Sequence, residues 1–279
     1  MKKALCLAAF LVLMVQVPLW CYDTSPSSWQ IVPEAIYATA TGGGAWVTEL
    51  QITSFGTVPA AIYVYFDYTG GSRGSFLLHA GLPQYRSVRY NNILGELQVL
   101  DPGFTYFGRV GSLFCYTESS ESLIQIQAKT VNGTFGKVFP GLNPLEGTTA
   151  AAGRPMLIQD LVQNATYRTS VGLYNSDDVS ITVTLTIVDA DNVTVGLPFT
   201  KTLNAYGFLS FNPFVQAGVP AGTFANCWLY INVTTGGSSG NGLMGYGSIA
   251  NNLTNDTSAL MARQYDTLGS AAPPAPIRH

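Results

Sequence analysis

The sequence predicts an all-β protein built from two tandem β-sandwich units, and three observations support this prediction. Apolar residues alternate with polar or small residues in short runs such as 62–66 and 181–187, and a period of two is typical of half-buried strands. Clusters of Gly, Asn, Asp and Ser separate these runs, as turns between strands do. No window of a dozen residues keeps helical spacing of apolar residues together with helix caps, so we expect no long helix.

The first element in chain order is a leader. Lys2 and Lys3 precede the apolar run 4–15, and a proline-containing stretch then ends the pattern. The run is too short to cross about 30 Å of hydrocarbon, which indicates a signal peptide over residues 1–21. The short lysine pair is typical of bacterial export, and Trp20 before Cys21 disfavours lipid attachment.

No later segment is continuously apolar for 18 residues, so we expect a mature chain without a transmembrane segment. Its location is then secreted, extracellular or within the bacterial cell envelope.

Two short apolar runs follow the leader, at 29–32 and 35–37. They predict an extra strand ahead of Trp46. This strand could pair within the chain or with the sheet edge of a neighbouring molecule.

The remaining strands occur twice. Trp46 lies 121 positions before Tyr167, and at this offset Leu50 matches Val171 without a gap. The match continues through Ile62, Val64, Phe66, Leu82, Tyr85, Val88 and Tyr90, which fall on Val183, Leu185, Ile187, Leu203, Tyr206, Leu209 and Phe211. A repeated pattern of this kind indicates a duplicated unit.

These matches define the expected organisation of the mature chain. We predict sandwich repeat 1 at 30–139, a linker at 140–153 that is semi-stiff where proline occurs, sandwich repeat 2 at 154–266, and a disordered Pro/Ala-rich tail at 267–279.

The strand openings 46–52 and 167–175, together with the turn 203–207, carry a resemblance to a known group. The segment Tyr167–Asn175 resembles the "aromatic-Arg-Thr-x-Leu-x-Leu-x-Asn" opening of uncharacterised tandem-repeat secreted bacterial proteins. The resemblance implies an extracellular immunoglobulin-like or jelly-roll-type sandwich and supplies no catalytic residues.

Cys115 and Cys227 remain in the mature chain. A disulfide between them would close a long loop and join the two repeats. Each cysteine also stands among apolar residues, which favours burial as an unpaired thiol and leaves the disulfide as the alternative.

The sequence offers few groups for catalysis or for a cofactor. Its two histidines are His79, in a predicted strand, and His279, at the end of the tail, so a serine triad lacks a base. No zinc-ligand spacing occurs in the mature chain. Thirteen Lys and Arg against 16 Asp and Glu form no basic stripe, which argues against nucleic acid as a partner. We therefore expect no enzyme, no metal and no cofactor.

Carboxylates are the remaining acid or base candidates, and glycoside hydrolysis would need two of them in one groove. The candidates are Glu49, Asp67, Glu118 and Glu121. Separately, the segment 189–192 could offer oxygens to Ca²⁺, although Asp and Asn residues joining two strands are typical of a turn.

The two repeats differ at the positions of Tyr63 and Tyr65. If Ile62 and Val64 point inward, both tyrosines point outward, where the second repeat has threonines. An outward tyrosine pair suits a protein interface or a sugar-stacking platform, and the alternative is that a neighbouring segment covers it.

The sequence therefore favours a non-catalytic extracellular structural or interaction protein, acting at a cell surface or in adhesion and self-associating through edge strands. The alternative is a carbohydrate-binding accessory protein that uses Tyr63 and Tyr65, with a glycan as partner.

Overall fold

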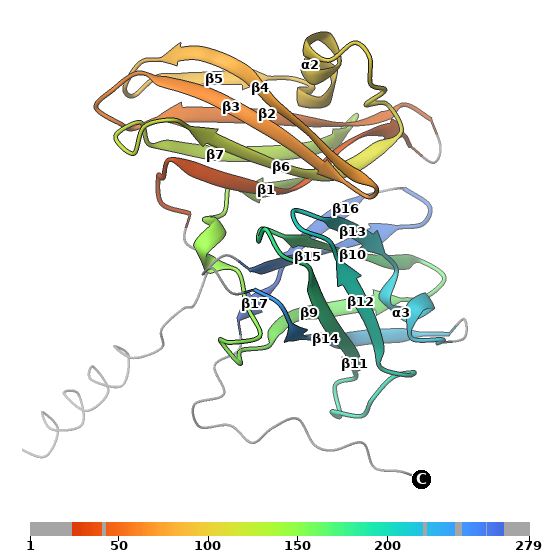
Figure 1. The fold of residues 1–279 in the computed structure, drawn as a ribbon. Helices are drawn as coiled ribbons and strands as arrows, with labels where there is room; N and C mark the ends of the chain where they lie inside the picture. The colour runs from red at the N-terminus through yellow and green to blue at the C-terminus, as the bar shows by residue number, and fades with distance from the viewer. Residues whose placement is uncertain (1–23, 41–42, 220–221, 238–241, 255, 265–279) are drawn as a thin grey trace, which may run out of the picture.

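Antiparallel strands make up both halves of the chain, which confirms the all-β sandwich prediction (Figure 1). The computed structural model describes residues 24–40, 43–219, 222–237, 242–254 and 256–264. The predicted signal peptide at 1–21 and the predicted tail at 267–279 lie outside the described residues.

The first half folds as one curved sheet that forms two layers. Its strands are β1 (Trp29–Thr39), β2 (Ala45–Ser54), β3 (Ala60–Tyr68), β4 (Gly71–Leu82), β5 (Ser87–Tyr90), β6 (Arg109–Thr117), β7 (Ile124–Asn132) and β8 (Phe135–Pro140). The order is β4-β3-β6-β1-β2-β7-β8, with β5 also paired to β2. Strand β1 joins the layers because it pairs with β6 along most of its length and with β2 at its end.

The second half is a sandwich of two separate sheets. Its strands are β9 (Met156–Gln163), β10 (Tyr167–Asn175), β11 (Ile181–Val188), β12 (Phe199–Leu203), β13 (Phe208–Phe211), β14 (Phe224–Thr235), β15 (Leu243–Asn251), β16 (Thr257–Met261) and β17 (Arg263–Gln264). One sheet has the order β13-β10-β15-β16, and the other β12-β11-β14-β9-β17.

The two halves repeat one pairing register. Leu50 pairs with Tyr90 in the first half, and Val171 pairs with Phe211 in the second. Likewise, Ala60 pairs with Leu82, as Ile181 pairs with Leu203. Each of these pairs recurs at the offset of 121 positions that matches Trp46 to Tyr167. The sequence pattern and the strand pairing therefore describe the same duplication.

Two short helices follow equivalent strands in the two halves. Helix α2 (Ile93–Leu100) follows β5, and helix α3 (Pro213–Gln216) follows β13. The Asn92 side chain caps α2 by accepting a hydrogen bond from the Gly95 amide at 3.1 Å. The eight residues of α2 are too few to give a helical pattern over a dozen positions, which is why the sequence analysis did not find it.

The segment expected to be a linker at 140–153 is bonded to both halves. The backbone of Leu142 pairs with Ile31 of β1, and that of Thr148 pairs with Leu243 of β15. Both Leu142 and Thr148 are buried. A short 3-10 helix, η1 (Pro144–Glu146), lies between these two contacts. The segment therefore joins the halves as part of their packing, not as a spacer.

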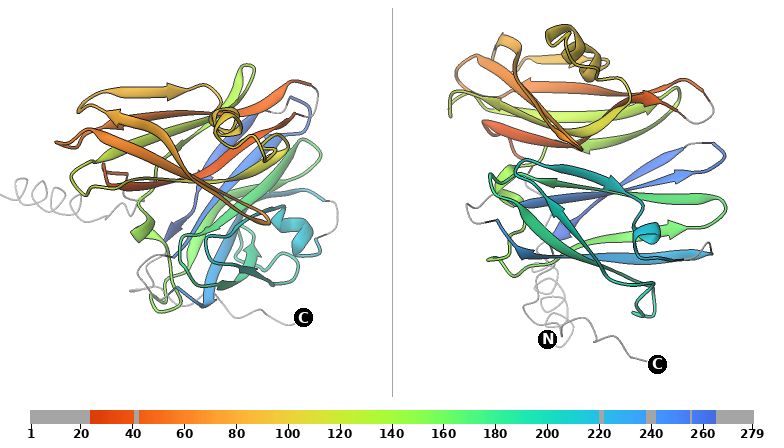
Figure 2. Two further views of the ribbon diagram at one scale, coloured as in Figure 1. Left: turned by 45° about the horizontal axis from the view of Figure 1, so that its top comes forward. Right: turned by 45° about the vertical axis from the view of Figure 1, so that its right-hand side comes forward.

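The halves meet through the outer face of the sheet β13-β10-β15-β16, which lies against the first half (Figure 2). Tyr174, Phe208, Met244 and Tyr246 of this sheet are buried in the same core as the first half. Gly172 is needed here, because a Cβ at that position would lie 2.0 Å from Cε1 of Tyr246. The relative placement of the halves is thus fixed by buried apolar contact.

Candidate functional site

Strand β3 carries the two tyrosines that the sequence singled out. Ile62, Val64 and Phe66 are fully buried in the core, whereas Tyr63 and Tyr65 point to the opposite face and are half-buried. This follows from the period of two along a strand. The outer face of β3 continues across its neighbours β6 and β1.

Aromatic rings from three strands lie side by side on this face. The pairing sets Tyr63 opposite Tyr116 of β6, and Tyr116 opposite Trp29 of β1. One step along, Tyr65 lies opposite Phe114. We call this group the aromatic strip: Trp29, Tyr63, Tyr65, Phe114 and Tyr116.

Ring contacts hold the strip together. The rings of Tyr63 and Tyr116 stack with centroids 5.3 Å apart and an interplanar angle of 22°, and those of Tyr65 and Tyr116 at 5.9 Å and 23°. The Ser75 and Tyr116 hydroxyls are 2.6 Å apart and hydrogen-bonded. Partial burial and a hydrogen bond to Glu118 raise the pKa of Tyr63. These contacts fix the rings in place. The outer side of the strip remains open to solvent at Trp29, which is 38% exposed.

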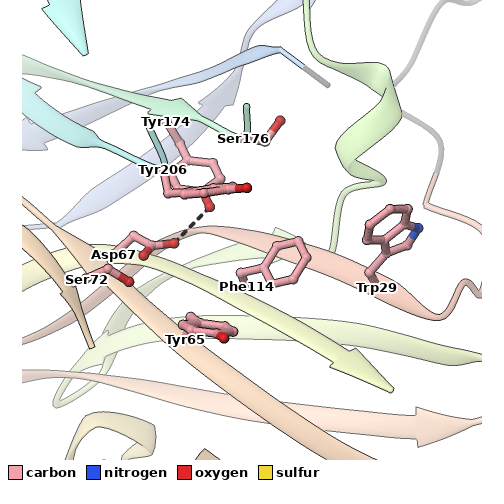
Figure 3. A pocket seen from close by; sticks show the side chains of 8 residues that line it. All are labelled: Trp29, Tyr65, Asp67, Ser72, Phe114, Tyr174, Ser176 and Tyr206. Carbon is pink, nitrogen blue, oxygen red and sulfur yellow. Dashed lines mark hydrogen bonds between the residues drawn. The ribbon is translucent and has the colours of Figure 1, made fainter. Parts of the chain in front are cut away.

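One end of the strip lies in a groove between the first half and the second half (Figure 3). The groove has a volume of about 280 Å³. Its lining residues are Trp29, Tyr65, Asp67, Ser72, Phe114, Tyr174, Ser176 and Tyr206. The first five belong to the first half and the last three to the second, so the groove exists only because the halves are packed together.

Asp67 lies at the inner end of this groove. It follows Tyr63 and Tyr65 on the outward face of β3, one step beyond Tyr65, and is only 2% exposed. Its Oδ2 accepts a hydrogen bond of 2.8 Å from the hydroxyl of Tyr174. Burial raises the pKa of Asp67 to about 6, because the neighbouring hydroxyls of Ser72 and Tyr174 offset only part of the lost solvation.

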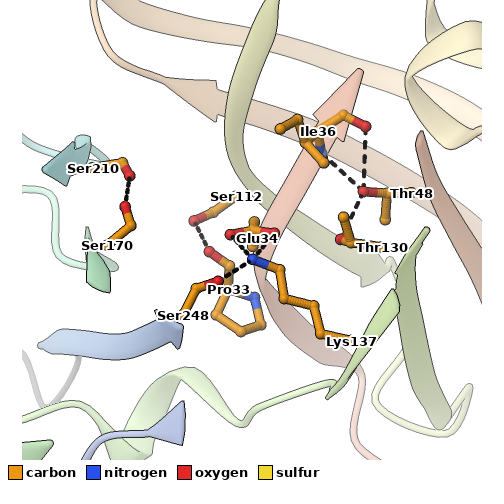
Figure 4. A network of polar contacts seen from close by, with 10 residues as sticks. All are labelled: Pro33, Glu34, Ile36, Thr48, Ser112, Thr130, Lys137, Ser170, Ser210 and Ser248. Carbon is orange, nitrogen blue, oxygen red and sulfur yellow. Dashed lines mark hydrogen bonds and ion pairs between the residues drawn. The ribbon is translucent and has the colours of Figure 1, made fainter. Parts of the chain in front are cut away.

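A buried ion pair anchors the halves elsewhere on their interface (Figure 4). A bulge in β1 between Val32 and Ala35 contains Glu34, whose carboxylate lies 2.8 Å from Lys137 Nζ. Lys137 also donates a hydrogen bond of 2.7 Å to the Ser248 hydroxyl of β15. The ion pair belongs to the first half and the serine to the second, so this contact helps to hold the geometry of the groove.

The second half does not repeat the strip. At the offset of 121 positions, Thr184, Thr186 and Val188 stand where the first half has Tyr63, Tyr65 and Asp67. The candidate site is therefore a property of the first half, completed by three residues of the second.

Cys115 and Cys227 do not form a disulfide with each other. Both are free and buried, Cys115 in the core of the first half and Cys227 in the core of the second. Burial raises the pKa of Cys115 to about 12. The disulfide considered from the sequence is thus replaced by two separate buried thiols, as their apolar neighbours favoured.

Other residues singled out in the sequence serve local structure. Glu49 forms a salt bridge of 2.6 Å with Arg89. Nδ1 of His79 accepts a hydrogen bond from the Gly81 amide. In the 189–192 turn, Asp189 Oδ1 accepts hydrogen bonds from the Asp191 and Val193 amides, which is turn chemistry.

Glu118 and Glu121 do not line the groove, and Asp67 is its one carboxylate among the described residues. In the same parts of the chain, no group of three His, Cys, Asp or Glu side chains is arranged to hold a metal ion. The described helices include none that is both long and apolar enough to cross a membrane.

Several residues of the aromatic strip and of the groove were not assigned to a site from the sequence. Phe114 and Tyr116 alternate with the buried Leu113 and Cys115. This alternation predicts an outward aromatic pair by the same reasoning that applied to Tyr63 and Tyr65. No local signal points to Tyr174 or Tyr206, because their place depends on how the halves pack.

No family model and no curated protein matches the sequence. Among solved structures, the chain is similar to the apo form of Pleurotus ostreatus lectin, at 14% identity and a TM-score of 0.23, over 92% of this chain and 84% of that chain. A likeness this weak carries no argument, so the function is inferred from the residues of the site.

Proposed function

We propose that the protein is an exported, non-catalytic binding module that holds a saccharide on the aromatic strip and in the adjoining groove. The observation that carries this proposal is a row of partly exposed rings across three strands, in which the tyrosines of β3 and β6 stack and Trp29 of β1 meets Phe114 edge-on. Aromatic faces give large contact area with little loss of side-chain entropy, and the apolar C–H face of a pyranose ring packs on such a surface.

The groove supports the same proposal. It combines aromatic walls with a few polar groups, namely the Asp67 carboxylate and the hydroxyls of Ser72, Ser176 and Tyr206. This composition is typical of sites in which apolar contact gives affinity and polar groups orient the ligand. A single lining carboxylate favours binding over hydrolysis by the two-carboxylate mechanism.

The proposal is tested by glycan-array screening, followed by calorimetry with the saccharides that bind. The double variant Tyr63→Ala with Tyr65→Ala removes two rings of the strip and should weaken binding at least tenfold. Tyr167→Ala is the matched control, because Tyr167 is 40% exposed and belongs to the second half. Array silence, or equal affinity of the double variant and the control, would refute the proposal.

Self-association is a second candidate function, and one observation favours it. Leu77 of β4 lies opposite Tyr63 and is 46% exposed, so the strip continues as an apolar surface that a second copy could cover. Pairing through residues 29–37 does not contribute, because β1 lies inside the sheet between β6 and β2. Light scattering over a range of protein concentration tests this candidate, and a constant monomer mass would exclude it.

A further inference from the structure

The inner end of the groove contains a carboxylate oxygen that lacks a hydrogen-bond partner. Oδ2 of Asp67 accepts from Tyr174, but Oδ1 is buried and no described residue donates to it with regular geometry. Buried acceptors are almost always hydrogen-bonded, so one left without a donor is expected to have a function. Figure 3 shows the carboxylate beside Ser72, with the ring of Tyr65 below it and the ring of Phe114 to its right.

The charges around Asp67 are also unbalanced. The described lining of the groove includes no Lys, Arg or His. Among the described residues of the second half, Tyr174 and Tyr206 are the titratable side chains that line the groove with Asp67, and Asp177 and Asp178 lie near Tyr206. Burial is the largest cause of the raised pKa of Tyr206, and the negative charges of Asp178, Asp177 and Asp67 raise it further. No cation among the described lining residues therefore balances the Asp67 carboxylate at the inner end of the groove.

The neighbouring rings suit a cation as well. Trp29, Tyr65 and Phe114 line the groove, and the negative faces of aromatic rings attract ammonium groups. Elsewhere in the first half such faces already have protein partners: Arg109 lies over Tyr68, and Lys137 over Phe139. No Lys or Arg among the described residues lies over a ring of the strip, so these rings can accept a cation from a ligand.

We propose that the inner end of the groove binds a protonated amino group, and that the ligand is an amino sugar with a free amine, such as a β-1,4-linked oligomer of glucosamine. The amine would face Asp67 and Ser72, while sugar rings lie on Tyr65 and along the strip. An N-acetyl group removes the charge and adds bulk at the same position. This inference rests on the proposed saccharide function and names its ligand class.

The test compares three tetramers that share one linkage: glucosamine, N-acetylglucosamine and glucose. Calorimetry at pH 7 should show the glucosamine tetramer binding at least tenfold more tightly than the other two. In Asp67→Asn, which keeps the side-chain shape, this preference should disappear, so that the affinities for the three tetramers become equal. Asp191→Asn is the control for net charge, because Asp191 is exposed in the 189–192 turn and lies outside the groove.

The pH dependence gives a second readout. Below pH 6 the sugar amines are largely protonated while Asp67, whose pKa burial raises to about 6, takes up a proton. The preference for glucosamine should therefore decline between pH 6 and pH 4 in the parent protein and stay nearly flat in Asp67→Asn. Asp178 is present in both proteins, so its titration does not contribute to the difference.

The outcomes separate the two proposals. Equal affinity for the three tetramers overturns the amine site and leaves the saccharide function standing. A glucosamine preference that survives in Asp67→Asn, or one that is also lost in Asp191→Asn, overturns the assignment to Asp67. Binding of none of the tetramers, with silence on the glycan array, overturns the saccharide function and this inference together.

Discussion

Replacing Asp67 with asparagine should stabilise the folded protein at high pH and have little effect at low pH. Asp67 is 2% exposed, and no Lys, Arg or His among the described residues that line the groove compensates its charge. The ionised form therefore costs the folded state free energy, whereas the protonated form and the asparagine amide do not. Asparagine also keeps an oxygen that accepts the hydrogen bond from Tyr174.

The size of the effect follows from the pKa. Burial raises the pKa of Asp67 from 3.8 to about 6, a shift of about 2 units, and each unit corresponds to about 1.4 kcal/mol. Between these pH values the folded state binds more protons than the unfolded state, so stability falls as the pH rises. The cost is absent well below pH 3.8 and reaches about 3 kcal/mol above the folded-state pKa.

Urea denaturation of the parent protein and of Asp67→Asn at pH 4 and pH 8 measures this difference. We expect the variant to be more stable by about 2 to 3 kcal/mol at pH 8 and nearly equal in stability at pH 4. Asp191→Asn, at an exposed turn, should show a much smaller difference between the two pH values. A stability difference for Asp67→Asn that does not change with pH would refute the argument that Asp67 is buried without a compensating charge.

Two further predictions concern buried groups away from the groove. Lys137→Met leaves the Glu34 carboxylate buried without its partner, so it should lower the free energy of unfolding, measured by urea denaturation, by about 3 to 5 kcal/mol. Adding Glu34→Gln to this variant should recover part of the lost stability. A double variant no more stable than Lys137→Met would contradict the assignment of a buried ion pair. Burial raises the pKa of Cys115 to about 12, so a thiol reagent at pH 8 should modify it only after denaturation; rapid modification of the native protein would place it outside the core.

Local pattern was sufficient to predict the strands and their duplication. The alternation at 62–66 places Ile62, Val64 and Phe66 inside and the two intervening tyrosines outside, and the structure has this arrangement. Such assignments depend only on the period of the strand. The same reasoning predicted a strand at 29–37, although its position inside the sheet depends on pairing with β6 and β2.

The candidate site was only partly predictable because it depends on contacts between distant segments. Tyr63 stacks on Tyr116 because β3 pairs with β6, and sequence spacing does not reveal this pairing. Asp67 was one of four candidate acids, and its burial requires Tyr174, which is 107 positions away. Asp67 is thus a buried carboxylate in the groove only because the second half packs against the first.

The claim that the aromatic strip is the binding surface is tested most directly by NMR of the protein with isotope-labelled tyrosine, titrated with the glucosamine tetramer. The account predicts that the ring signals of Tyr63, Tyr65 and Tyr116 shift with ligand concentration while that of Tyr167 stays constant. Shifts confined to tyrosines outside the strip, or no shift at saturating ligand, would contradict it.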